Sequence, residues 1–255
     1  VVGIACGNDA SMFLLADGTV YSCGASGWGQ LGRAVGPGFQ NSSNLGIIPN
    51  LSDITQISMQ GTYALFLTRS GTVQSCGYNQ FGQLGRVVAN GSATVSNLGS
   101  IPQLSGVIAL SAGSGHSLFR LKNGSIWACG NNNSGQLGHI VKGGSQTVCN
   151  LALIPGLTGV KEVVAGGSHS IFIKNDGTVW NCGTNYQGLL GRVNNGGNAS
   201  ICNLDVVPGL TGIATAGADS FNSLYVRNDG SAVACGDNTY GQLGSWGRNS
   251  LYGGA

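Results

Sequence analysis

The chain has 255 residues, only 8% of them charged, and contains 46 glycines. An ordinary soluble domain has roughly 25% charged residues and roughly 7% glycine. The net charge of +2 comes without the clustered lysines and arginines of a nucleic-acid-binding surface, and no apolar run approaches the roughly 18 residues of a membrane-spanning helix. We therefore expect neither a nucleic-acid partner nor insertion into a membrane.

The sequence repeats with a period of 53 residues. The dipeptide Cys-Gly marks the period through Cys23, Cys76, Cys129, Cys182 and Cys235. An aromatic residue recurs upstream of each of these cysteines, as Phe13, Phe66, Phe119, Phe172 and Tyr225. We expect a single domain, 1–255, made of the repeats 1–53, 54–106, 107–159, 160–212 and 213–255.

Within each repeat, the segments predict β structure in the same order. The fourth copy begins with the apolar segment Val160 to Gly166, which predicts a first strand. Two further apolar segments flank a tight-turn signal of the Asn-Gly or Asp-Gly type, which predicts a hairpin because both residues accept positive φ. The turns are Asp17-Gly18, Ser70-Gly71, Asn123-Gly124, Asp176-Gly177 and Asp229-Gly230. A tail of the form "NLxxIPxL" can supply a fourth strand, and no long window has helical periodicity.

One repeat of this kind cannot bury both faces of its sheet, so the copies must pack against one another. Radial packing of 4–8 such units gives a β-propeller. We predict an all-β chain of five blades, in which the N-terminal segment "VVGIACG" completes the last blade because the fifth repeat stops before its own tail. The alternative is that the five blades are part of a six- or seven-bladed ring.

The third copy, "GSGHSLFRLKNGSIWACGNNNSGQLG", resembles the repeat of the regulator of chromosome condensation family, a group of β-propellers. The turn, the aromatic residue, the Gly-rich run and the "QLG" ending recur in order through essentially the whole chain. The resemblance implies the propeller fold. It also implies that His116 and His169, which share one repeat position, are structural residues that tie adjacent segments by hydrogen bonds.

Two features depart from the family pattern. The family usually has tryptophan where this chain has the repeated cysteine, and its best-known members have seven blades. The resemblance does not imply one function, because the family's functions include nucleotide exchange on a small GTPase, ultraviolet sensing and inhibition of a secreted hydrolase. The hairpin insertion of the exchange factor and the tryptophan cluster of the photoreceptor have no counterpart here.

Groups suited to catalysis are scarce. His116 and His169 each precede a serine, but neither copy supplies an acid that would orient the histidine as a general base. Glu162 is the only glutamate, and no pair of carboxylates is placed by the repeat to act as acid and base. No CxxC or Cys/His pair has the spacing of metal ligands. We therefore expect no enzymatic activity, no cofactor and no metal.

The cysteines allow two interpretations. The five that mark the period are expected to pack as small apolar thiols inside the blades. Cys149 and Cys202 share a second repeat position and could instead each form a disulfide with one of the five.

The Gly-rich runs carry the candidate binding residues. Aromatic side chains appear there among small polar residues, a setting that recognition surfaces use for proteins or sugars. They are Trp28, Tyr78, Phe81, Tyr186 and Tyr240. A repeated cation follows the "LG" that ends the Gly-rich run in the first four copies, where it could cap carbonyls or line one face of the ring: Arg33, Arg86, His139 and Arg192. The alternative for the aromatic residues is packing between blades. A second variable stretch, such as "VVANGSATVS", predicts a long loop in each of the first four copies.

Three functions remain open on the sequence alone. The first is a non-catalytic propeller that recognises a protein partner or assembles with itself, favoured outside a cell or on a cell or virion surface. The second is a lectin-like propeller with sugar pockets in the aromatic loops. The third is nucleotide exchange on a small GTPase, which we rank last because the insertion is missing.

Overall fold

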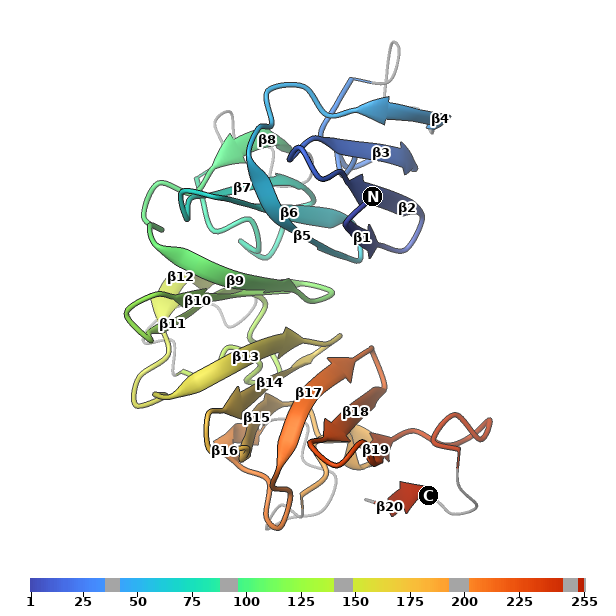
Figure 1. Ribbon diagram of the computed structural model, residues 1–255, viewed down its shortest axis with the longest axis vertical. Coiled ribbons are helices and arrows are strands. Elements are labelled where there is room, and N and C mark those ends of the chain that lie inside the picture. Colours follow the sequence, from blue (N-terminus) through green and yellow to red (C-terminus); the bar gives the residue numbers. More distant parts are fainter. Residues whose placement is uncertain (35–41, 88–95, 140–148, 193–201, 245–251, 255) are drawn as a thin grey trace.

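A computed structural model of the chain describes residues 1–34, 42–87, 96–139, 149–192, 202–244 and 252–254. In these residues, twenty strands form five four-stranded antiparallel sheets, which we number as blades 1 to 5 (Figure 1). The one described helix is a single 3-10 turn, η1 (Tyr186–Gly188). The long variable loops expected from the sequence lie mostly outside the described residues.

In each blade the strands follow one another in chain order. Blade 1 contains β1 (Gly3–Cys6), β2 (Ala10–Leu14), β3 (Val20–Gly24) and β4 (Ser42–Ile47). Blade 2 contains β5 (Ile54–Gln60), β6 (Tyr63–Thr68), β7 (Val73–Gly77) and β8 (Ser96–Ser100). Blade 3 contains β9 (Val107–Ala112), β10 (His116–Leu121), β11 (Ile126–Gly130) and β12 (Cys149–Leu153). Blade 4 contains β13 (Val160–Ala165), β14 (His169–Lys174), β15 (Val179–Gly183) and β16 (Cys202–Val206). Blade 5 contains β17 (Ile213–Ala218), β18 (Asn222–Arg227), β19 (Ala232–Gly236) and β20 (Tyr252–Gly254).

The predicted hairpins lie between the second and third strands of each blade. In blade 4, Ile173 pairs with Val179 across the turn, and Gly177 adopts a φ of 78°, which a side chain would disfavour. The Asp176 carboxylate accepts hydrogen bonds from the backbone N–H (2.9 Å) and the hydroxyl (2.6 Å) of Thr178. These bonds hold the pKa of Asp176 below its usual value. The turn chemistry read from the sequence therefore fixes the register of the hairpin.

The five blades follow one another around an arc, with β1, β5, β9, β13 and β17 on its inner side (Figure 1). All five of these strands line one central hollow, to which they contribute residues such as Cys6, Gln60, Ala112, Ala165 and Ala218. Side chains also link neighbouring inner strands. The Gln56 carboxamide donates to the Leu110 carbonyl (3.0 Å) and accepts from the Leu110 N–H (3.1 Å). This radial arrangement of antiparallel sheets is the predicted β-propeller architecture.

The hydrophobic core is divided among the interfaces between blades. Between blades 3 and 4, Leu118 and Ile126 of one sheet pack against Val163 and Phe172 of the next. The repeated aromatic residue is fully buried in blades 2 to 5, whereas Phe13 of blade 1 is half-buried. Blades 2 to 4 therefore each contribute to two cores, whereas blades 1 and 5 each contribute to one, so full burial of a sheet depends on a neighbour on both sides.

The prediction that the N-terminal segment completes the last blade is wrong. β1 pairs with β2 through Cys6 and Ser11, and β20 occupies the fourth place in blade 5 beside β19. β1 and β2 are joined by a short connection, so their antiparallel pairing costs less chain entropy than pairing of β1 with a strand of blade 5. The first and last blades also leave apolar side chains uncovered, since Ile4 is 71% exposed and Leu224 is 50% exposed.

Candidate functional site

The antiparallel strands give every blade two ends. We call the end that carries the Gly-rich run after the third strand the loop end. The opposite end, which carries the tight hairpin and the connection between blades, we call the hairpin end. In blade 2, Tyr78 and Phe81 follow β7 at the loop end, whereas Arg69 and Ser70 lie at the hairpin end.

The repeated histidines lie at the interfaces between blades. His116 Nε2 lies 2.8 Å from the Ser170 hydroxyl of the next blade, and His169 Nε2 lies 2.9 Å from the Ser223 hydroxyl. In blade 2 the same repeat position holds Tyr63, whose hydroxyl lies 2.9 Å from Ser117. The hydrogen-bonding role that the family resemblance implied for these histidines is present in the structure.

The direction of these hydrogen bonds follows from their acceptors. The Ser170 hydroxyl donates its one proton to the Gln136 carbonyl (2.7 Å), so His116 must donate from Nε2 to Ser170. Burial lowers the pKa of His116 to about 3 and that of His169 to about 4, which keeps both imidazoles neutral at neutral pH. A histidine that donates to a serine cannot also remove that serine's proton, so this arrangement does not activate Ser170 as a nucleophile.

The thiols of the repeated cysteines also form hydrogen bonds across the interfaces between blades. The Cys182 thiol donates to the Gln136 carbonyl of the preceding blade (3.4 Å), and the Cys76 thiol donates to that of Gln30 (3.6 Å). Burial raises the pKa of Cys76 to about 12. Four of the described cysteines are free thiols: Cys6, Cys23, Cys76 and Cys235. The side chains of Cys149 and Cys202 lie outside the described part, so the disulfide alternative stays a prediction.

The repeated arginines brace the outer strands of their own blades. Arg33 Nη2 donates to the Ser22 carbonyl (3.0 Å) and to the Asn44 carbonyl (2.8 Å), which joins β3 to β4. Arg86 and Arg192 make the corresponding contacts in blades 2 and 4. His139, the cation position of blade 3, is half-buried, and its carbonyl accepts from the Asn132 carboxamide at 3.3 Å.

Three of the candidate aromatic residues form a row at the loop end of blades 1 and 2. The ring centroids of Trp28 and Tyr78 lie 5.0 Å apart at an interplanar angle of 69°, and those of Tyr78 and Phe81 lie 5.9 Å apart at 79°. Such edge-to-face contacts are favourable for aromatic pairs. Trp28 belongs to blade 1 and the other two to blade 2, so the row crosses the boundary between blades while 40% of Trp28 stays exposed.

The other two candidate aromatic residues stand apart from this row. Tyr186 lies on η1 in blade 4 and is 58% exposed, and Tyr240 of blade 5 is 91% exposed. Tyr240 shares the repeat position of Trp28 and Phe81, whose rings lie against the following blade. Its exposure therefore reflects the uncovered side of blade 5.

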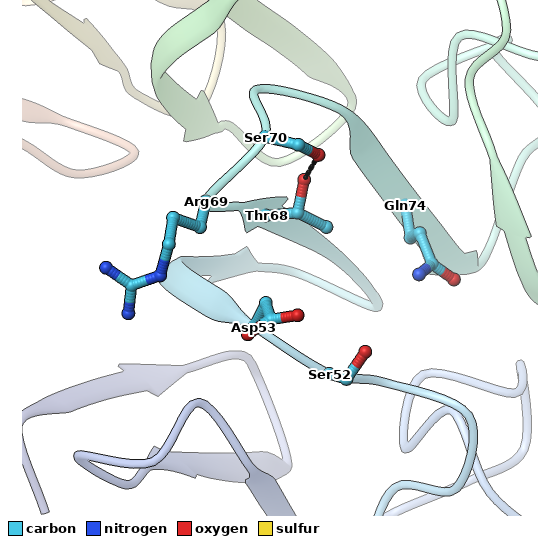
Figure 2. Close-up of a pocket in the computed structure, with 6 residues that line it drawn as sticks. All are labelled: Ser52, Asp53, Thr68, Arg69, Ser70 and Gln74. Atoms are coloured by element: carbon cyan, nitrogen blue, oxygen red, sulfur yellow. Dashed lines mark hydrogen bonds between the residues drawn. The ribbon is translucent and has the colours of Figure 1, made fainter.

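Sequence reasoning missed a polar hollow at the hairpin end of blade 2. It has a volume of about 430 Å³ and lies between the connection that precedes β5 and the β6–β7 hairpin (Figure 2). All the residues that line it are polar: Ser52, Asp53, Thr68, Arg69, Ser70 and Gln74. The signal in the sequence was the departure of these positions from the other repeats, which have glycine at the position of Asp53.

The described residues contain no group of three or more histidine, cysteine or acidic side chains that could hold a metal ion. Among the same residues, no helix is long and apolar enough to cross a membrane.

The fold and the repeated interface residues define a β-propeller built from tandem repeats. Two family models, both described as the regulator of chromosome condensation (RCC1) repeat, match the chain. One covers residues 1–30, 107–136 and 160–189, and the other covers residues 123–173. The chain belongs to this repeat family, which confirms the resemblance read from the sequence.

Individual proteins show the same similarity. The regulator of chromosome condensation of Mus musculus is 28% identical over 254 residues, which cover 92% of this chain and 59% of the mouse protein. The Drosophila melanogaster protein of the same name is 31% identical over 69% of this chain and 31% of its own length. This chain thus spans less than two thirds of these relatives.

Solved structures agree on the fold. Yeast RCC1 (Prp20), solved with Kap60 bound, matches with a TM-score of 0.82 at 21% identity over 98% of this chain and 59% of its own. Human WBSCR16 matches with a TM-score of 0.81 at 22% identity over 98% of this chain and 65% of its own. At this identity the similarity establishes the propeller fold alone.

Proposed function

We propose that the chain is a non-catalytic protein-recognition module that binds its partner through the loop end of blades 1 and 2. The observation that carries the proposal is the row of Trp28, Tyr78 and Phe81. It presents rigid aromatic surface across two blades, with Trp28 40% exposed. Tryptophan and tyrosine are enriched among the residues that dominate binding energy at protein interfaces.

The surroundings of the row suit recognition. Loop backbone is fixed by the side chains of the repeat itself: the Gln30 carboxamide accepts from the Trp28 N–H (2.9 Å), and the Gln83 carboxamide accepts from the Phe81 N–H (3.0 Å). Both glutamines are buried, so the aromatic residues stand on a rigid base. A surface that is ordered before binding loses less conformational entropy when a partner docks.

Relatives support a protein as the partner class. The yeast RCC1 structure contains bound Kap60, and a second yeast structure, of Prp20p, is described with its binding to Gsp1p and histones. These partners belong to those proteins. They are the first probes to apply to this chain, together with a second copy of the chain itself.

The test compares one aromatic variant with a matched control. Binding to immobilised Kap60, Gsp1p and histones is measured for the wild type, Trp28→Ser and Phe221→Ser. Phe221 is an exposed aromatic residue of blade 5 that lies outside the row. We expect Trp28→Ser to weaken binding at least tenfold and Phe221→Ser to leave it unchanged, with light scattering reporting self-association in parallel. Binding that Trp28→Ser leaves intact would refute the use of this surface.

Nucleotide exchange is the second candidate function, because the mouse regulator of chromosome condensation aligns with 92% of this chain. Release of a fluorescent GDP analogue from Gsp1p tests it directly. If the chain accelerates release of the analogue above its spontaneous rate, its function is nucleotide exchange and not protein recognition alone.

A further inference from the structure

The polar hollow of blade 2 lies at the opposite end of the strands from the aromatic row. Ser52 and Asp53 come from the chain segment before β5, Thr68, Arg69 and Ser70 from the hairpin, and Gln74 from β7 (Figure 2). The Thr68 and Ser70 hydroxyls lie 2.9 Å apart, which holds the hairpin wall together. The hollow is therefore distinct from the loop-end surface, and a role for it does not rest on the proposed function.

Asp53 stands where the repeat otherwise uses glycine. The corresponding residues of the next three repeats are Gly106, Gly159 and Gly212, which have φ values of 67° to 68°. Asp53 adopts the same left-handed conformation, with φ at 55°. A side chain in this region costs roughly 1 kcal/mol of backbone strain. Its carboxylate makes no hydrogen bond with the described residues, so no internal contact explains the choice of aspartate.

In blade 4 the corresponding place is occupied by the protein's own side chains. Lys174, at the repeat position of Thr68, holds its ammonium 5.3 Å from the ring centroid of Trp180, at the repeat position of Gln74. This cation–π contact covers the hairpin end of the sheet. Blade 2 has Thr68 and Gln74 at the same two positions. Because these side chains are smaller than lysine and tryptophan, the space between them is left open as the hollow.

Four polar groups of the hollow lack a side-chain hydrogen bond to any described residue. They are the hydroxyl of Ser52, the carboxylate of Asp53, the guanidinium of Arg69 and the carboxamide of Gln74. The negative charge of Asp53 and the positive charge of Arg69 cancel, so the lining has no net charge. It offers several hydrogen-bond donors and several acceptors. A ligand that matches this lining is neutral and carries several groups that both donate and accept.

We propose that the hollow of blade 2 binds a neutral polyhydroxylated ligand, a sugar unit of one or two rings. The volume of about 430 Å³ accommodates such a unit. Asp53 accepts from ligand hydroxyls, Arg69 donates to them, and Ser52 and Gln74 do both. Aromatic stacking is absent from the lining, so recognition depends on hydrogen bonds to the hydroxyls.

The test screens the 255-residue chain on an array of immobilised neutral mono- and oligosaccharides. Asp53→Gly installs the residue that the other repeats use and should lose array binding while it raises the melting temperature by a few degrees. Loss of binding together with a gain in stability excludes unfolding as the cause. Lys122→Ala is the matched control, because Lys122 is the exposed residue of blade 3 at the repeat position of Arg69; it should bind as the wild type does.

A second variant tests the site by filling it. The double substitution Thr68→Lys with Gln74→Trp installs the blade 4 pair in blade 2, and it should abolish binding without loss of stability. Absence of binding to every sugar on the array would overturn the proposal. Sugar binding that survives in both Asp53→Gly and the double variant would also overturn it. Sugar binding that is lost only in Trp28→Ser would place the sugar site at the loop end and not in the hollow.

Discussion

Blade 4 and blade 5 carry the same residue pattern but differ in what covers them. Ile171 and Ile173 of blade 4 are fully buried against blade 5, whereas Leu224 and Val226, at the same repeat positions in blade 5, are 50% and 39% exposed. The sheets have the same strand order and hairpin register. The difference shows that the core of this fold belongs to the interfaces and not to the single blade.

The polar contacts follow the same rule. His169 of blade 4 is buried and donates to Ser223 of the next blade, while the repeat position of His169 in blade 5 holds Asn222, whose carboxamide donates to the Asp237 carbonyl of its own blade (2.7 Å). Between blades 1 and 2, the two partner positions are Ala10 and Ala64. At these two positions, each interface between blades therefore has either a hydrogen-bond donor paired with an acceptor or two apolar side chains.

The largest effect expected from this comparison is on packing. Ile171→Ala should lower the free energy of unfolding by about 2–5 kcal/mol, because it leaves a cavity in a buried interface. Leu224→Ala removes a similar side chain at the same repeat position and should cost less than about 1 kcal/mol. Chemical denaturation of both variants measures the difference. Equal costs would mean that the outer face of blade 5 is covered in solution.

Acid should act on the interfaces through the two buried histidines. Their folded pKa values of about 3 and 4 lie below the value of about 6.5 expected in the unfolded chain, so the unfolded chain binds more protons between these limits. Stability should therefore fall as the pH drops from about 6.5 to about 4, by up to roughly 1.4 kcal/mol per pH unit for each histidine.

The matched variant for this prediction comes from the chain itself. Tyr63 fills the histidine position in blade 2 and lies beside Ser117, so the double variant His116→Tyr with His169→Tyr keeps a hydroxyl donor at each interface. Unfolding measured across this pH range should lose most of its pH dependence in the variant. An unchanged slope would assign the acid sensitivity to the carboxylates.

A smaller effect is expected from single interface hydroxyls. Ser170→Ala should cost about 1–3 kcal/mol, because it leaves the buried His116 donor and the Gln136 carbonyl without this partner. Ser11 has the same repeat position in blade 1, on its uncovered side, and Ser11→Ala should be close to neutral. Thermal unfolding distinguishes the two, and a costly Ser11→Ala would indicate that blade 1 also has a partner.

The smallest perturbation is alkylation of the thiols. Iodoacetamide should modify Cys6, which is exposed, and Cys23, which is half-buried, well before the buried Cys76 and Cys235. Burial raises the pKa of both of the latter thiols to about 12 and also blocks access to them. Peptide mapping by mass spectrometry gives the order of modification. Early modification of Cys76 would show that the interface between blades 1 and 2 opens readily.

Much of the fold could be predicted from local patterns. The turn signals located the hairpins, and the position of the repeated aromatic residue identified a core that Phe66, Phe119 and Phe172 form in the structure. The place of β1 could not be predicted in this way, because the segment is compatible with either blade 1 or blade 5. Its pairing with β2 depends on chain connectivity in three dimensions.

The candidate site was predicted less completely. Sequence variation in the Gly-rich runs singled out Trp28, Tyr78 and Phe81, but the pattern did not indicate that the three would touch across a blade boundary. The hollow at Asp53 was not predicted because the repeat pattern is defined by positions that the copies share. Asp53 is a position at which one copy differs from the others.

The sequence by itself determined the repeating unit, its strands and its turns, since these depend on residues close together in the chain. Only the tertiary structure decided which copies of a repeat position are core and which are surface, which aromatic side chains meet, and where a hollow remains. Those outcomes depend on contacts between neighbouring repeats, whose arrangement follows from how the sheets pack and not from any local pattern.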